Sequence, residues 1–144
     1  MIYLDTSVLL VHTLTQSIEI ARSKAFRKLF AKVNSGVVSA ATSFYALHEL
    51  HVFAIENAPD LELGYEYGKS ALLEILKAPI ILLPFVTRTE RRRQAGKFVS
   101  LRDASDLPHA ISAYASGCEA IVAYDDHFKA IDHVIRYKNP EDYL

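Results

Sequence analysis

Ile2-Tyr3-Leu4-Asp5-Thr6-Ser7-Val8-Leu9 stands at the beginning of the chain and joins an apolar run to an acidic residue. Residues 1–4 are apolar and β-favouring, which predicts a buried strand, and residues 7–14 then predict a short helix or turn. Asp5 stands where the strand ends. Because charged side chains are rarely kept beside apolar segments without a partner, Asp5 is a candidate site residue.

The rest of the chain alternates between the two kinds of pattern. Apolar runs bounded by Gly, Pro or polar residues predict further strands at 37–39, 80–83, 119–124 and 134–137. Helical spacing and capping residues predict helices at 17–34, from Thr42 or Ser43 to about 57, 61–77, 87–98 and 105–116. This alternation favours an α/β fold with a mostly parallel sheet flanked by helices.

Composition limits the class of protein. The chain has 144 residues, 51% hydrophobic and 23% charged, which suits one globular domain over residues 1–144. A net charge of -1 provides no global attraction for nucleic acid, so any basic surface is local. One cysteine, Cys118, allows no internal disulfide. With no apolar segment of membrane-spanning length, we expect no membrane association and a cytoplasmic protein in mature form.

Three further acids stand at comparable places. Glu49 lies inside the apolar stretch 44–55, Asp106 begins the run 106–111, and Asp125 ends the run 120–124. If the strands before Asp5 and Asp125 are neighbours, both carboxylates face one crevice beyond the strand ends. Several carboxylates there would repel one another, and a hard divalent cation such as Mg²⁺ or Mn²⁺ would remove that conflict.

Each acid also has a plain structural interpretation. Asp5 and Asp106 can cap the helices that follow them, and Asp125-Asp126 can form an ordinary turn. A zinc site is disfavoured, because His48 and His51 are three residues apart whereas the zinc-protease pattern places them four apart.

In these motifs the chain resembles the PIN domain family, to which VapC-type toxins belong. The matching segments are Ile2–Leu9, Ser39–Leu50 with a strand-end serine before Glu49, Asp106-Leu107-Pro108-His109-Ala110, and Ala123–Phe128. The resemblance runs through nearly the whole chain. It implies a three-layer α/β sandwich and an endoribonuclease that hydrolyses single-stranded RNA with Mg²⁺ or Mn²⁺. It also implies an antitoxin partner and a homodimer.

The resemblance also implies roles for individual residues. Asp5, Asp106 and Asp125 would bind the metal, and Glu49 would bind metal or orient water. Thr6 would hold Asp5 or a metal-bound water. His109 would have a structural role beside the pocket.

One position departs from the family pattern. Ala123 stands where the family usually has Thr or Ser, so a hydroxyl is missing and Asp126 could share the role of Asp125. Asp103, three residues before Asp106, is a spare acid that would share its face on a continuous helix.

The dense basic patch at 88–102 allows two interpretations. It is either a solvated helix face or a phosphate-binding surface, for which Arg92 and Arg93 are the candidates.

Other classes of function fit less well or stay open. An aspartyl-phosphate hydrolase would need an acid at Ser7, and a receiver domain would need a second acid beside Asp5 and a later lysine. A PIN-like housekeeping RNA-processing nuclease and a catalytically inactive RNA- or protein-binding module remain as alternatives.

Overall fold

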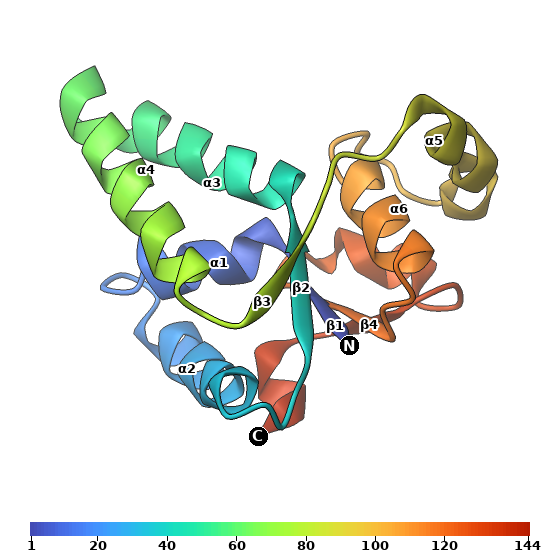
Figure 1. Ribbon diagram of the computed structural model, residues 1–144, viewed down its shortest axis with the longest axis horizontal. Helices are drawn as coiled ribbons and strands as arrows, with labels where there is room; N and C mark the ends of the chain where they lie inside the picture. Colours follow the sequence, from blue (N-terminus) through green and yellow to red (C-terminus); the bar gives the residue numbers. More distant parts are fainter.

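The computed structural model describes residues 1–144 and contains a five-stranded, fully parallel sheet in the order β3-β2-β1-β4-β5. The strands are β1 (Ile2–Leu4), β2 (Ala40–Ser43), β3 (Ile80–Leu83), β4 (Ala120–Val122) and β5 (Arg136–Lys138). Figure 1 shows β2 and β3 in front, with helices on both sides of the sheet. The predicted α/β class and parallel sheet are therefore confirmed.

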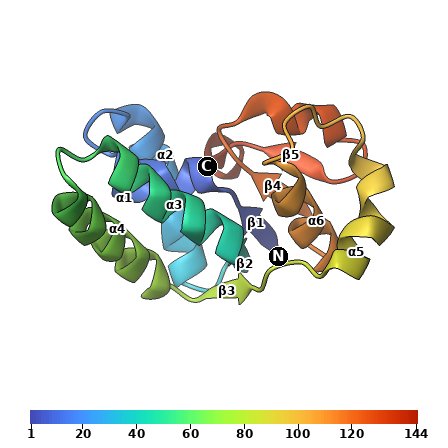
Figure 2. The ribbon, with the colours of Figure 1, turned by 90° about the horizontal axis from the view of Figure 1, so that it is seen from above.

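Helices form the two outer layers of the sandwich. One face carries α1 (Thr6–Thr13), α2 (Ile20–Asn34), α3 (Phe44–Asn57), α4 (Leu61–Leu76) and the 3₁₀ helix η3 (Pro140–Tyr143). The other carries α5 (Arg88–Gln94), α6 (Leu107–Ala115) and the 3₁₀ helices η1 (Ala95–Phe98) and η2 (Asp126–Ile131). Seen from above in Figure 2, α1 to α4 and α5 with α6 lie on opposite sides of β1. None of the helices is long and apolar enough to cross a membrane.

Two separate hydrophobic cores hold these layers together, because successive side chains of a strand point to opposite faces. Ile2 and Leu4 of β1 enter the core beneath α1 to α4, whereas Tyr3 enters the core beneath α6 and η2. All three side chains are fully buried. The opening strand therefore anchors both halves of the molecule, and it places Asp5 at the point where they meet.

The second strand lies later in the chain than predicted. Residues 37–39 precede β2, and Val37 is 74% exposed. Gly36 has a φ of +76°, and the N–H groups of Val37 and Val38 donate to the Lys32 carbonyl, so this segment terminates α2. The strand is instead built from small residues that fit between the helix layers. Consequently the strand-end serine is Ser43, which caps α3, and not Ser39.

Other boundaries shift by smaller amounts. The predicted helix at 87–98 divides into α5 and the 3₁₀ helix η1, and the predicted strand at 119–124 is reduced to three residues, Ala120–Val122. The helix expected from residue 17 begins at Ile20, and that expected from residue 105 begins at Leu107. The last strand, expected at 134–137, is Arg136–Lys138. These shifts leave the order of the elements unchanged.

Candidate active site

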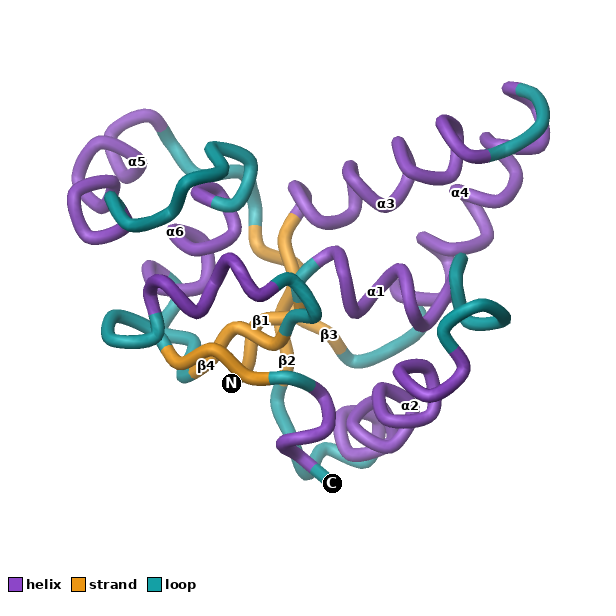
Figure 3. Tube along the Cα trace, turned by 180° about the vertical axis from the view of Figure 1, so that it is seen from behind, coloured by secondary structure: helices purple, strands orange, loops and turns teal.

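The site lies where the strand order reverses direction. From β1 the chain builds outward to β2 and β3 on one side, and β4 and β5 are added on the other. The Asp5 N–H donates to the Val122 carbonyl at 3.1 Å, which joins the ends of β1 and β4. Figure 3 shows these two strands side by side from behind. Ligands of open α/β sheets bind in the crevice beyond such a reversal, and this is where Asp5 and Asp125 stand.

Asp5 serves as a helix cap and also faces the site. Its Oδ2 accepts hydrogen bonds from the Ser7 N–H at 3.1 Å and the Ser7 hydroxyl at 2.7 Å. The Ser7 hydroxyl in turn accepts from the Tyr124 N–H at 2.9 Å, so one hydroxyl ties the start of α1 to the end of β4. The other oxygen, Oδ1, is turned toward His109. Capping therefore uses only one of the two carboxylate oxygens of Asp5, and the other faces the site.

A buried histidine links Asp5 to Glu49. His109 Nδ1 lies 3.6 Å from Asp5 Oδ1, and its Nε2 contacts Glu49 Oε1. The Tyr3 hydroxyl lies 2.7 Å from His109 Nδ1 and 2.6 Å from the Ser43 hydroxyl. We call Tyr3, Asp5, Ser43, Glu49 and His109 the His109 cluster. Two strands, β1 and β2, and helices on both faces of the sheet meet in it.

Burial and charge act against each other within this cluster. Burial lowers the pKa of His109, but the Glu49 hydrogen bond and the charge of Asp5 outweigh it, so the pKa is raised. Burial also raises the pKa of Asp5, opposed by the His109 charge and the Ser7 hydrogen bonds. As an imidazolium, His109 donates from both ring nitrogens and neutralises one of its two acidic neighbours. One negative charge then remains uncompensated.

A second histidine links Asp106 to Asp125. His127 Nδ1 lies 3.2 Å from Asp106 Oδ2 and 3.2 Å from Asp125 Oδ1. Asp106 occupies the cap position of α6, yet its side chain makes no capping hydrogen bond, so the plain capping interpretation is wrong for this residue. We call Asp103, Asp106, Asp125, Asp126 and His127 the His127 cluster.

The charges in the His127 cluster shift the pKa of its members. Burial and the charge of Asp125 raise the pKa of Asp106 to about 6, against the opposing His127 hydrogen bond. The same hydrogen bond and the charge of Asp125 raise the pKa of His127. Asp5 also contributes to the shift of Asp106, so the two clusters interact electrostatically.

Asp103 and Asp126 complete two groups of close ligand atoms. One group is Asp103, Asp106 and His127, and the other is Asp125, Asp126 and His127; within each group the ligand atoms lie within 4.8 Å of one another. Asp103 reaches Asp106 through a turn and not along a continuous helix, and its Oδ1 accepts from the Ser105 N–H and hydroxyl.

The donor set fits a hard divalent cation. The carboxylates of Asp5, Glu49, Asp106 and Asp125 form ion pairs with histidines, and with no lysine or arginine. Carboxylate oxygens in excess over positive partners are the environment that such ions select. Asp106 and Asp125 each belong to one of the two groups of close ligand atoms, whereas Asp5 belongs to neither; an ion held by such a group would polarise a phosphate oxygen and activate a water.

Thr6 does not hold Asp5 in the predicted way. Ser7 supplies the hydroxyl that donates to Asp5, while the Thr6 hydroxyl is buried and has no hydrogen-bond partner. Tyr3 and His127 were not predicted. The available signals were a polar-tipped aromatic in an apolar strand and a histidine directly after Asp125-Asp126.

The predicted basic residues lie outside both clusters. Arg92 and Arg93 are exposed on α5, and Arg93 pairs with Glu90 at 3.2 Å. Ala123 is fully buried in the core beneath α6, so a methyl group fills the position where a hydroxyl was expected. His48 and His51 belong to neither of the two groups of close ligand atoms.

Comparison with known proteins identifies the fold. No protein-family model matches the chain, and no curated protein sequence does. Solved structures match along almost the whole chain. VapC20 from Mycobacterium tuberculosis, a toxin that cleaves the sarcin-ricin loop, gives a TM-score of 0.69 at 16% identity, covering 94% of this chain and 98% of VapC20. The chain has the VapC fold.

Two VapBC structures support the same conclusion. VapBC2 from Rickettsia felis, bound to a DNA fragment of its promoter, matches with a TM-score of 0.67 and 19% identity over 96% of this chain and 98% of the matched chain. DNA-bound VapBC from Salmonella typhimurium matches with a TM-score of 0.63 and 18% identity. This match covers 96% of this chain and 97% of the matched chain. The VapC-type fold expected from the sequence motifs is thus confirmed, at sequence identities of 16% to 19%.

Proposed function

We propose that this protein is a Mg²⁺- or Mn²⁺-dependent endoribonuclease that hydrolyses single-stranded RNA and acts as the toxin of a toxin–antitoxin pair. The observation that carries the proposal is the meeting of four carboxylates from four different elements, without a lysine or arginine partner, beyond the β1–β4 junction. The VapC fold and the toxins that share it support the same activity.

We assign a role to each site residue according to its burial and contacts. Asp5, Asp106 and Asp125 hold the metal, with Asp126 beside Asp125 as an additional carboxylate. Glu49, whose side chain is 43% exposed, is accessible to solvent and orients the attacking water. The buried hydroxyl of Thr6 has no protein partner and is assigned to a metal-bound water.

His109 acts as a positioning residue. It lies between Asp5 and Glu49 and is itself fixed by the Tyr3 hydroxyl, so it sets the distance between a metal ligand and the residue that orients water. Its position in the buried core keeps both carboxylates in place on their separate helices.

Partners and location follow from the same proposal. VapBC complexes share the fold, so we propose an antitoxin partner, a homodimer and a cytoplasmic site of action. Arg92 and Arg93 are proposed as outer phosphate contacts for RNA. The buried methyl of Ala123 favours one competing function, a catalytically inactive binding module.

Cleavage of RNA decides between these functions. Wild type, Asp5→Asn and Asp106→Asn are incubated with single-stranded RNA and Mg²⁺ or Mn²⁺, with Glu119→Gln as a control, because Glu119 is an exposed acid beside the chain terminus. We expect both Asp variants to lose about 100-fold or more in rate while Glu119→Gln retains activity. Equal cleavage by all four proteins would refute the catalytic assignment, and no cleavage by wild type would favour the inactive module.

Metal binding is measured independently by thermal unfolding. A cation that binds only the folded state stabilises the wild type by RT ln(1 + c/Kd), where c is the free cation concentration, so the Tm rises with the logarithm of the cation concentration above Kd. Asp5→Asn should lose most of this shift, because it removes a charged ligand while preserving the shape of the side chain. An unchanged shift in Asp5→Asn would exclude Asp5 as a metal ligand.

A further inference from the structure

Two hollows flank the His127 cluster, and they meet at it. The first has a volume of about 650 Å³ and lies between residues 100–104 and η2, where Asp103, Asp126 and His127 line it. The second, about 370 Å³, lies between α1, α2, α3 and the end of β4, where Ser7 and Asp125 line it. His127 lines the first hollow and Asp125 the second, and His127 Nδ1 lies 3.2 Å from Asp125 Oδ1, so the two hollows adjoin at this pair of residues.

The second hollow contains a prepositioned arginine. The guanidinium carbon of Arg22 lies 4.5 Å from the centre of the Tyr124 ring, and Arg22 Nη1 donates to Glu19 at 2.9 Å. Tyr124 is fixed in turn, because its hydroxyl donates to the Arg22 carbonyl at 3.2 Å. The Arg22 side chain is 50% exposed, so it can donate to a phosphate from its remaining N–H groups.

The first hollow contains an arginine of a different kind. Arg102 is exposed and forms no ion pair, even though Asp103 and Asp126 line the same hollow. Its charge is therefore available to a ligand that passes the cluster. The two arginines thus stand on opposite sides of the carboxylates that would act on a phosphodiester.

An aromatic ring from α3 completes the second hollow. Phe53 lies one helical turn beyond Glu49 on the same face of α3, is only partly buried, and lines the hollow with Arg22. Aromatic rings beside phosphate-binding groups are how proteins bind single strands without reading their sequence, because every base offers a flat face.

We propose that a single strand of RNA runs through both hollows, with Arg22 and Arg102 binding the phosphates on either side of the scissile one and Phe53 stacking on a base. This path rests on the proposed ribonuclease function and adds residues that the acidic site does not include. It places the inner phosphate contacts at Arg22 and Arg102, and leaves Arg92 and Arg93 on α5 as outer ones.

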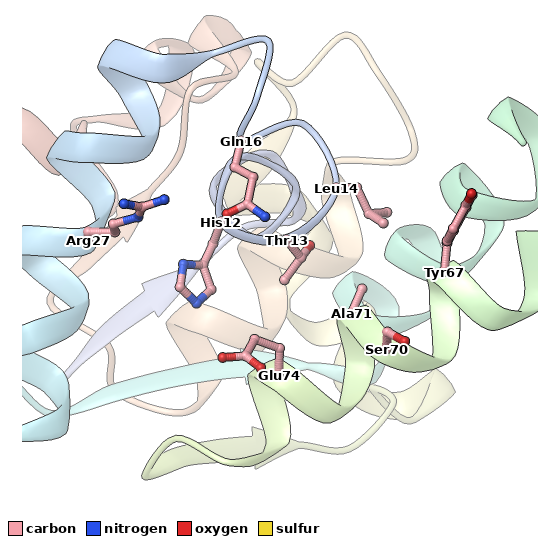
Figure 4. Close-up of a pocket in the computed structure, with 9 residues that line it drawn as sticks. All are labelled: His12, Thr13, Leu14, Gln16, Arg27, Tyr67, Ser70, Ala71 and Glu74. Carbon is pink, nitrogen blue, oxygen red and sulfur yellow. The ribbon is translucent and has the colours of Figure 1, made fainter.

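A third hollow offers a matched control. It lies between α1, α2 and α4, has a volume of about 460 Å³, and contains none of the site acids. Figure 4 shows Arg27 of α2 beside His12 at this hollow. Arg27 is exposed, forms no ion pair, and lies on the same helix as Arg22, yet the proposed path does not reach it.

The experiment measures RNA affinity as a function of salt. Fluorescence anisotropy follows a labelled single-stranded RNA binding to the full chain in Ca²⁺, a hard cation that carboxylates bind, and gel electrophoresis verifies that the RNA stays intact. The variants are Arg22→Gln, Arg102→Gln and the control Arg27→Gln. The plot of log K against log salt has a negative slope, to which each phosphate contact contributes about 0.7 in magnitude. Arg22→Gln and Arg102→Gln should therefore each reduce the magnitude of the slope by about 0.7. Arg27→Gln should leave it unchanged.

Two further variants separate contact from structural effects. Arg22→Lys keeps the positive charge and should retain the wild-type slope, whereas a loss caused by misfolding would persist in it. Phe53→Leu keeps an apolar side chain and should weaken binding about tenfold without changing the slope, because stacking involves no charge. Thermal unfolding of each variant verifies that it is folded.

The outcomes separate this path from the function on which it rests. Wild-type slopes in both Arg22→Gln and Arg102→Gln, with RNA bound and cleaved by the wild type, would overturn the path alone. Failure of the wild type to bind RNA would overturn the path together with the proposed function. A reduced slope in the two variants and not in Arg27→Gln supports the path.

Discussion

The His109 cluster and the His127 cluster each place one imidazole between two carboxylates, but they differ in burial. The His109 side chain is 2% exposed, and the Tyr3 and Ser43 hydroxyls support it from the sheet. The His127 side chain is 57% exposed and lines the hollow between residues 100–104 and η2. The same three chemical groups therefore form a rigid support in one place and an accessible site in the other.

This difference assigns the two halves of the site different tasks. The buried cluster connects helices from both layers through β1, so its interactions are part of the fold. The open cluster holds four carboxylates for one histidine, and the His127 ring is largely in solvent, so this is the side from which a cation and a phosphate can enter the site. The predictions below test this division, from the largest expected effect to the smallest.

Removing His109 should have the largest effect on stability. His109→Ala leaves Asp5 and the Tyr3 hydroxyl buried without their partner, and we expect the free energy of unfolding to fall by about 3 kcal/mol. His127→Ala is the matched control, and it should leave the free energy of unfolding close to the wild-type value because its ring is largely in solvent. Urea denaturation measures both. Equal losses in the two variants would contradict the division into a buried and an open cluster.

The stability of the metal-free protein should depend on pH through Asp106. Its pKa is about 6 in the folded protein, against 3.8 for an aspartate side chain in water, so the folded state binds the proton more tightly. The contribution of Asp106 to stability is therefore greatest at low pH and falls as pH rises from about 4 to 7. The raised pKa of His127 acts in the same direction, since the stabilisation from its charged form is lost as pH rises through that pKa.

We expect this loss to be about 2 kcal/mol, less than the full linkage value because solvent screens one side of the cluster. Urea denaturation in EDTA across this pH range measures it. Asp106→Asn should flatten the curve near pH 6, and Glu119→Gln should not. An Asp106→Asn curve parallel to that of the wild type between pH 4 and 7 would show that Asp106 is not destabilised in its ionised form.

Removing the Tyr3 hydroxyl should weaken the buried cluster without disrupting it. Tyr3→Phe eliminates the hydrogen bonds to Ser43 and His109, and we expect a loss of about 1 kcal/mol in the free energy of unfolding. Tyr114→Phe is the control, because its hydroxyl accepts a hydrogen bond from Lys97 at the surface. If Tyr3→Phe leaves the free energy of unfolding unchanged, this hydroxyl does not support His109.

The smallest effect is expected at the basic surface of α5. Arg92→Gln and Arg93→Gln should each weaken RNA binding by roughly twofold at moderate salt, less than Arg102→Gln, because neither residue lines the hollows beside the open cluster. Anisotropy titrations of the three variants compare them directly. A larger loss in either α5 variant would move the main RNA contact from the open cluster to α5.

Much of the fold could be predicted from local patterns. The alternation of apolar runs and amphipathic segments predicts the parallel sheet, since each pattern follows the period of its own element. The strand at 37–39 was misplaced because Val37 and Val38 are apolar and β-branched, whereas the buried strand is built from Ala40 and Ala41. Burial there depends on the space between two helix layers, which a local pattern does not contain.

The candidate site was predictable only in part for the same reason. Asp5 and Asp125 could be paired in advance because parallel strands that end in acids bring those acids to one edge. The bridging roles of His109 and His127 depend on contacts between residues that are far apart in the chain. Thr6 and Ser7 are both hydroxyls beside Asp5, and the direction of the first turn of α1 determines that Ser7 donates to it.

The amino-acid sequence alone specifies the strands, the helices and the acids that follow them, because propensity, periodicity and capping are properties of neighbouring residues. The division of the site into a buried and an open cluster depends on the folded chain. The Tyr3 hydroxyl of β1 contacts His109 of α6, and Asp106 and Asp125 meet at His127. Burial and charge at those points are determined by which elements pack together, and that packing sets the pKa of Asp106 and the exposure of His127.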